Sequence, residues 1–148
     1  MSNLKKLLFS FMVMFYFTCF LITPSYSLDC YAQEWTVYIY DGIQDSVIDV
    51  HVKSKDDDLG HHNITFDLGY RFAFCESIFG NTLFTGDFYH GSQFVHFNVF
   101  DDVVSSIIGG PQVENTNVYW LLKQDGYYLS KEFKAYHDPV WKFMGHWQ

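Results

Sequence analysis

Apolar and polar side chains alternate at every second position along several stretches of this chain. Ile48, Val50 and Val52, for example, are separated by Asp49 and His51. Because successive side chains of a β-strand point to opposite faces, this period of two predicts strands that bury one face and expose the other. We therefore predict strands near residues 35–40, 48–53, 62–66, 70–75, 82–88, 94–100, 119–123 and 127–133.

Glycines and short turns separate these strands at intervals typical of an antiparallel sandwich. Asp125-Gly126 is a favoured two-residue hairpin turn. Residues 103–108 are the one stretch that favours a helical turn, although the β-branched residues there weaken that prediction. Aromatic residues make up 21% of the chain, enough to fill the space between two facing sheets. The predicted fold class is all-β: a small antiparallel β-sandwich of about seven or eight strands, with at most a short helical segment.

Residues 53–60 read KSKDDDLG and interrupt the alternation abruptly. No hydrophobic core can accommodate the three adjacent carboxylates of Asp56, Asp57 and Asp58 without partners. The segment is therefore predicted to be a strand that ends in an exposed, charged loop, in which Gly60 takes the positive φ that lets the chain reverse.

The same segment resembles a signature of the plant self-incompatibility protein family, the secreted S-protein homologues. Five further blocks follow the family order, so the similarity covers most of residues 35–128. They are WTV at 35–37, Phe66 with GYRFAF at 69–74, FGNTLF at 79–84, FNVFD at 97–101 and WLLKQDGY at 120–127.

This resemblance implies a secreted signalling or recognition protein that acts as a ligand for a cell-surface receptor, rather than an enzyme. Loops are the expected contact regions, because the strands supply a rigid scaffold. We expect partner contacts from residues 53–62, 88–93 and 105–116. The candidate partner-binding residues are Lys53, Lys55, Asp56, Asp57, Asp58, His61 and His62.

The cysteines depart from the family pattern of four cysteines in two disulfides. The corresponding places here read Val52, Gly86 and Val118, so the usual four family cysteines are missing. Outside residues 1–27 only Cys30 and Cys75 remain. In an oxidising compartment these two thiols either pair or stay free, and we expect pairing. Because Cys75 shares the side of its strand with Arg71, the bond should be a staple on the surface rather than in the core.

The first 27 residues have the pattern of a secretory signal peptide. Lys5 and Lys6 precede an apolar run at residues 7–22, and small residues at Ser25 and Ser27 mark a cleavage site. A membrane anchor is the alternative, because the run approaches the length of a spanning helix. Cleavage would leave residues 28–148 as one domain in the extracellular space, the apoplast.

Charge excludes some partners of the processed chain. The processed chain would keep all 17 acidic residues but only seven of the nine basic ones, which lowers its formal charge from −8 to −10. Such an acidic surface argues against nucleic acid and against anionic membranes. No later apolar run predicts membrane insertion, and the sequence indicates no oligomeric state.

Little in the sequence points to metal or cofactor chemistry. Neighbouring His61 and His62 should point to opposite sides of an extended segment, so they are poor joint ligands. The acidic triplet lacks the alternating ligand spacing of a calcium loop. The further candidate ligands, His51, His90 and His96, are expected to be surface or strand residues. We therefore predict no metal site and no cofactor.

Two further possibilities come from the residues themselves. Asn63-Ile64-Thr65 is the chain's one acceptor site for N-glycosylation, either occupied by a glycan or left bare if the strand that starts there buries it.

No catalytic motif is present. The alternative function is an extracellular carbohydrate-binding module or a cell-wall hydrolase built on a β-sandwich.

Overall fold

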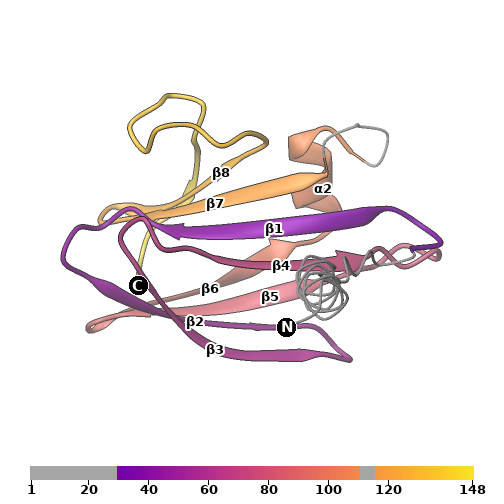
Figure 1. Cartoon of the computed structure of the whole chain (residues 1–148), viewed down its shortest axis with the longest axis horizontal. Helices are drawn as coiled ribbons and strands as arrows, with labels where there is room; N and C mark the ends of the chain where they lie inside the picture. Colours follow the sequence, from indigo (N-terminus) through magenta and orange to yellow (C-terminus); the bar gives the residue numbers. More distant parts are fainter. Residues whose placement is uncertain (1–29, 111–115) are drawn as a thin grey trace, which may run out of the picture.

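Two β-sheets face each other and enclose a common core, as Figure 1 shows for the computed structural model. The structure describes residues 30–110 and 116–148. This arrangement confirms the predicted all-β sandwich. The elements are β1 (Glu34–Asp41), β2 (Val47–Lys53), β3 (Asp58–Thr65), β4 (Tyr70–Cys75), β5 (Phe84–His90), β6 (Gln93–Phe100), α2 (Asp102–Ile108), β7 (Asn117–Lys123), β8 (Gly126–Ser130) and β9 (Lys142–Gly145).

Strand order defines a five-stranded sheet, β4-β1-β7-β8-β9, and a four-stranded sheet, β3-β2-β5-β6. Neighbouring strands pair antiparallel except β1 and β7, which run parallel with Val37 opposite Val118. The chain leaves β6 through α2 and begins β7 at the same end of the sheet where β1 begins (Figure 1). The strand β7 consequently enters the sheet beside β1 and in the same direction.

The core lies between the sheets and is built largely from aromatic and β-branched side chains. Trp35 and Trp120 are almost completely buried. The ring centroid of Phe74 lies 4.6 Å from that of Phe84 and 4.8 Å from that of Phe100. The expectation that aromatic side chains fill the space between the two sheets thus holds for these residues, whereas Phe79, Tyr89, Phe133 and Phe143 are exposed.

The helix α2 confirms the predicted helical turn. Its N-cap is Asp101, whose side chain accepts a hydrogen bond from the amide of Val104 at 2.8 Å. Gly109 follows the last turn with φ 121°, a conformation that favours glycine. The local capping residues therefore outweigh the weak helix propensity of the β-branched residues.

Some predicted boundaries are wrong. The strand expected to end at residue 133 is β8, which stops at Ser130, and the short strand β9 was not predicted. The hairpin between β7 and β8 turns at Gln124 and Asp125, since Gly126 already pairs with Lys123. The alternation rule fails for β9 because its four residues include no buried position.

Within the described ranges, 30–110 and 116–148, no helix has the length and apolar character that crossing a membrane requires. The predicted signal peptide, residues 1–27, lies outside those ranges.

Candidate functional site

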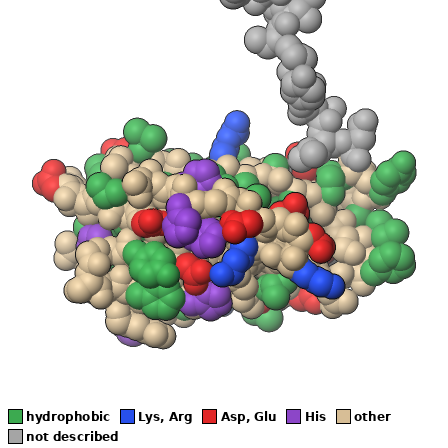
Figure 2. Space-filling view, turned by 90° about the horizontal axis from the view of Figure 1, so that it is seen from below, with side chains coloured by type: hydrophobic (Ala, Val, Ile, Leu, Met, Phe, Trp, Pro, Cys, Tyr) green, Lys and Arg blue, Asp and Glu red, His purple; other side chains and the backbone are tan. Residues whose placement is uncertain are grey.

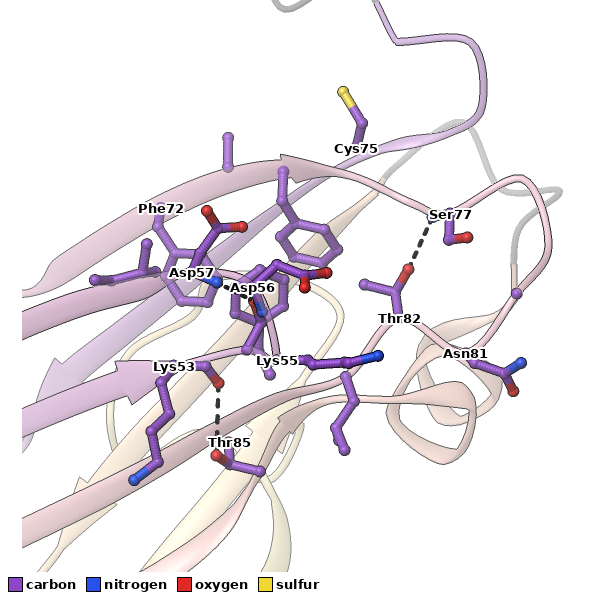
Figure 3. A pocket seen from close by; sticks show the side chains of 17 residues that line it. Lys53, Lys55, Asp56, Asp57, Phe72, Cys75, Ser77, Asn81, Thr82 and Thr85 are labelled. Atoms are coloured by element: carbon purple, nitrogen blue, oxygen red, sulfur yellow. Dashed lines mark hydrogen bonds between the residues drawn. The ribbon is translucent and has the colours of Figure 1, made fainter.

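A cleft opens at the edge of the sandwich, where the two sheets separate beside β4. Figure 3 shows its lining side chains, and its volume is about 820 Å³. It is bounded by the β2–β3 loop, by β4 and by the segment that leads into β5. Its apolar lining includes Leu59, Phe72, Phe74, Leu83 and Phe84.

Hydrogen bonds of Ser54 hold the β2–β3 loop in shape at one side of this cleft. Its hydroxyl oxygen accepts bonds from the amides of Asp56 at 3.3 Å and Asp57 at 3.0 Å. Its own amide donates to the carbonyl oxygen of Asp57 at 2.7 Å. The backbone is therefore satisfied locally, and within the described residues no side chain pairs with the carboxylates of Asp56 and Asp57.

The predicted partner-binding residues divide into two groups. Lys53, Lys55, Asp56 and Asp57 all line the cleft. The other three, Asp58, His61 and His62, do not line it and belong to β3.

The predicted loop at residues 53–62 is therefore too long. Only residues 54–57 connect the strands, because Lys53 pairs with Asp58 and His51 with His61. Gly60 does adopt a positive φ of 77°, but it does so within β3, next to a shift in the pairing register. Asp58 can lie on a strand because its side chain is on an exposed face, where the carboxylate stays solvated. A charged residue in the sequence indicates exposure but does not distinguish an exposed strand from a loop.

The two other predicted contact loops also change. Residues 88–93 contain mostly strand, since β5 ends at His90 and β6 starts at Gln93, which leaves a turn at Gly91 and Ser92. Residues 105–116 begin in α2, and residues 111–115 lie outside the described part of the chain.

A second polar feature crosses the exposed face of the four-stranded sheet. His61, His51, Asp87 and His96 stand opposite one another on β3, β2, β5 and β6, so they form one row across all four strands. We call this the histidine–aspartate row. Figure 2 shows histidine, acidic and lysine side chains gathered on this face. Sequence reasoning missed Asp87, although its place in an alternating strand already predicted an exposed side chain.

Asp87 connects the members of this row. Its carboxylate accepts a hydrogen bond from His96 at 2.6 Å and from Lys53 at 3.3 Å, and His51 Nδ1 lies 3.9 Å away. Partial burial raises the pKa of Asp87, but the bonds from His96 and Lys53 together outweigh it and leave the pKa below its ordinary value. The aspartate is therefore held in its charged form.

The rest of the row is similarly paired. The rings of His51 and His61 stack with centroids 4.2 Å apart, and His61 contacts Asp49 at 2.8 Å. His51 Nε2 lies 2.8 Å from Asp58. The pKa of Asp58 is lowered because its carboxylate accepts a hydrogen bond from the amide of Gly60, which has the largest effect, and a second one from His51.

Histidines 61 and 62 point to opposite sides of β3, as expected for an extended segment. His61 stacks on His51, whereas His62 stacks on Tyr70 with centroids 3.9 Å apart. In the described ranges, no group of three or more histidine, cysteine or acidic side chains has a geometry suited to a metal ion.

Asn63 lies on the outward face of β3, opposite Asp49 on β2. Both Asn63 and Thr65 are exposed, while Ile64 between them is buried. The acceptor site is thus a strand position whose amide side chain points to solvent.

The sulfur atoms of Cys30 and Cys75 are joined in a disulfide, with Cα atoms 5.4 Å apart. Cys75 is exposed and points away from the core, and Cys30 is half-buried. The bond ties the segment before β1 to the end of β4.

The outer face of the five-stranded sheet carries tyrosines. Tyr38 and Tyr119 stack with centroids 4.9 Å apart, and Phe133 lies 5.0 Å from Tyr40 and 6.2 Å from Tyr119. Burial, followed by the charge of neighbouring tyrosines, raises the pKa of both Tyr40 and Tyr119.

Comparison with known proteins places the chain in a family. The family model for plant self-incompatibility protein S1 matches residues 36–147. The S-protein homolog 5 of Arabidopsis thaliana is 42% identical over 52 residues, which is 35% of this chain and 41% of that protein. The S-protein homolog 1 of the same plant is 33% identical over 98 residues, 65% of this chain and 62% of that protein.

The matched segments thus span less than two thirds of either relative. No solved structure matches this chain. Because the family model covers both sheets of the sandwich, this chain belongs to the plant self-incompatibility protein S1 family.

Proposed function

We propose that this protein is a secreted recognition protein that acts as a ligand for a cell-surface receptor in the apoplast and has no catalytic role. The observation that carries this proposal is the cleft of about 820 Å³ beside the β2–β3 loop. The loop presents two carboxylates, Asp56 and Asp57, without partners among the described residues, and an apolar lining lies directly beneath them. A partner would therefore find both hydrophobic contact area and charge at one place.

The family membership supports this proposal. It makes a recognition role and an extracellular location the expected ones, and the disulfide between Cys30 and Cys75 is compatible with an oxidising compartment. The predicted cleavage after Ser27 belongs to the same proposal.

Saturable binding to living plant cells tests this function. The mature protein, residues 28–148, would be produced through a secretory pathway, labelled and titrated onto protoplasts. We expect saturable binding that falls at least tenfold in the double variant Asp56→Asn, Asp57→Asn. The matched control removes two exposed charges that do not line the cleft, through Asp45→Asn and Asp102→Asn. Binding that does not saturate, or equal losses in both double variants, would contradict the proposal.

One observation favours the second candidate, a carbohydrate-binding module. The stacked rings of Tyr38 and Tyr119 form a flat aromatic surface on the outer face, and Arg71 is exposed at the register position opposite Tyr38. Flat aromatic rings with hydroxyl groups offer both apolar contact and hydrogen bonds. A glycan array that gives signal for the wild type and none for Tyr119→Ala would favour this function. Release of reducing sugars from plant wall polysaccharides would instead indicate the hydrolase.

A further inference from the structure

Strand β4 forms one edge of the five-stranded sheet, and its backbone hydrogen-bonding groups alternate in direction. The amide of Glu76 donates to the carbonyl oxygen of Gln33 at 2.8 Å, next to the paired residues Phe74 and Trp35. Because backbone groups of alternate residues point to opposite sides of a strand, Phe72 and Phe74 bond to β1. The N–H and C=O groups of Ala73 then point away from β1, toward the open edge of the sheet.

The open edge of β4 faces the cleft. Ala73 and Cys75 line the cleft, although their side chains lie on the outer face of the sheet. Figure 3 shows the Cys75 side chain directed away from the cleft. Ala73 must therefore contribute its backbone to the lining, and among the described residues its N–H and C=O have no hydrogen-bond partner. Unpaired edge groups of this kind are a template for another strand.

The surroundings of this edge provide two further contacts. Phe72 and Phe74 point inward and lie 5.2 and 4.6 Å from the ring of Phe84, so an apolar surface adjoins the open backbone. Across the cleft stand Asp56 and Asp57, beside Lys55, which has no acidic partner in the described part of the chain, whereas Lys53 is bonded to Asp87. The rim is therefore net negative.

We propose that β4 receives an extended peptide segment of the partner as an added strand. Ala73 makes the central backbone hydrogen bonds, an apolar side chain of the peptide enters beside Phe72 and Phe74, and a lysine or arginine meets Asp56 and Asp57. This inference rests on the proposed receptor-ligand function and specifies how the partner is recognised. A basic segment fits better than a second copy of this chain, because a second mature copy, with a formal charge of −10 once residues 1–27 are removed, would bring like charge to the acidic rim.

Replacement of Ala73 by proline tests the backbone contact directly. Proline lacks the N–H group, and an edge strand tolerates it where that group points away from its neighbour. The pairing of β4 with β1 should therefore survive in Ala73→Pro, which the melting temperature and the circular dichroism spectrum would verify. Ala73→Val is the matched control, because valine keeps the N–H group and suits a strand.

The probe is a display library of random twelve-residue peptides selected on the immobilised mature protein. We expect selected peptides to alternate apolar residues with lysine or arginine, and to protect the Ala73 amide from hydrogen exchange. Their affinity should fall at least tenfold in Ala73→Pro and stay within about twofold in Ala73→Val. Reversal of the rim charge in Asp56→Lys, Asp57→Lys should independently weaken binding at least tenfold, which keeps the proposal testable if the proline variant unfolds.

Several results would overturn this inference. They are a library without binders, binders that are unaffected by both the proline and the charge-reversal variants, and a concentration-dependent dimer that the proline variant abolishes. The last result would make a second copy the occupant of the edge. The cell-binding assay separates this inference from the function on which it rests. Equal cell binding by wild type and Ala73→Pro removes the added strand but leaves the receptor ligand, whereas no wild-type binding removes the function itself.

Discussion

The indole Nε1 of Trp120 donates a hydrogen bond of 2.9 Å to the carbonyl oxygen of Val99 and so joins the two sheets inside the core. Trp120 belongs to β7 and Val99 to β6. The β5–β6 register shifts where Phe84 pairs with Phe100 but Thr85 pairs with Asn98, which leaves Val99 outside the ladder. A side chain of one sheet therefore satisfies a backbone group that a bulge frees in the other.

Replacement of Trp120 by phenylalanine should cost about 2 to 4 kcal/mol of unfolding free energy, because it leaves a cavity and an unsatisfied buried carbonyl. Urea unfolding would measure the loss. Trp147→Phe is the control, since Trp147 also donates to a carbonyl, that of Lys123 at 2.7 Å, but is only partly buried. An equal loss in both variants would argue against the special role of the Trp120 bond.

The β2–β3 loop should depend on Ser54 rather than on its acidic residues. Asp56→Asn with Asp57→Asn should change the unfolding free energy by less than about 0.5 kcal/mol, because both side chains are exposed. Ser54→Ala should cost about 0.5 to 1 kcal/mol, because two amides lose their acceptor. Chemical denaturation would compare the variants, and a calcium-dependent stabilisation lost in the double variant would instead point to a metal site.

Low pH should destabilise the folded protein, because Asp87 becomes protonated. A folded pKa below the ordinary 3.8 means that the associated stability is fully present above that value and is lost as the pH falls through the lowered pKa. His51 and Lys53 of β2 and His96 of β6 face this carboxylate. The melting temperature of Asp87→Asn should therefore depend less steeply on pH than that of wild type between about pH 5 and pH 2. Asp45→Asn, a control at an exposed position, should keep the wild-type slope.

The Cys30–Cys75 disulfide should be present in protein from the secretory pathway. A crosslink between residues 45 apart in sequence stabilises by roughly 4 kcal/mol in the chain-entropy model, an upper figure. Peptide mapping without reduction would find the linked peptides, and Cys75→Ser should lower the melting temperature. Two free thiols together with an unchanged melting temperature would show that the core alone stabilises the fold.

Asn63 should carry a glycan in the secreted protein, whose chain should begin at or near Leu28. Mass spectrometry before and after glycosidase treatment would detect it. Thr65→Ala should abolish the glycan, whereas Thr65→Ser keeps the acceptor pattern and should retain it. An unchanged mass after the glycosidase, or recovery of an uncut chain from membranes, would contradict these expectations.

Local periodicity predicted most of the fold, because a period of two reflects the geometry of a single strand. It revealed β1, β2, β4 and β6 nearly in full. It could not reveal β9, which has no alternating pattern, or the parallel pairing of β7 with β1, which depends on where a distant segment returns.

The candidate site was less predictable for a related reason. The unusual charge of residues 53–58 did identify the loop, but its partners across the cleft, Phe72 and Phe84, look like ordinary core residues in sequence. The alternating pattern around Asp87 indicates an outward-facing side chain but not its role, since its importance comes from pairing with His51 and His96 on neighbouring strands. Strand register, which single-sequence patterns do not contain, decides both features.

The parallel pairing of β1 with β7 also has a consequence for biosynthesis. The first strand to be made occupies an interior place in its sheet, between β4 and a strand that is translated near the end of the chain. During synthesis the backbone edge of β1 that pairs with β7 stays open until β7 has emerged. Such long-range pairing slows folding and prolongs the exposure of apolar surface. We therefore expect newly made chains to need chaperone protection until their last third is complete.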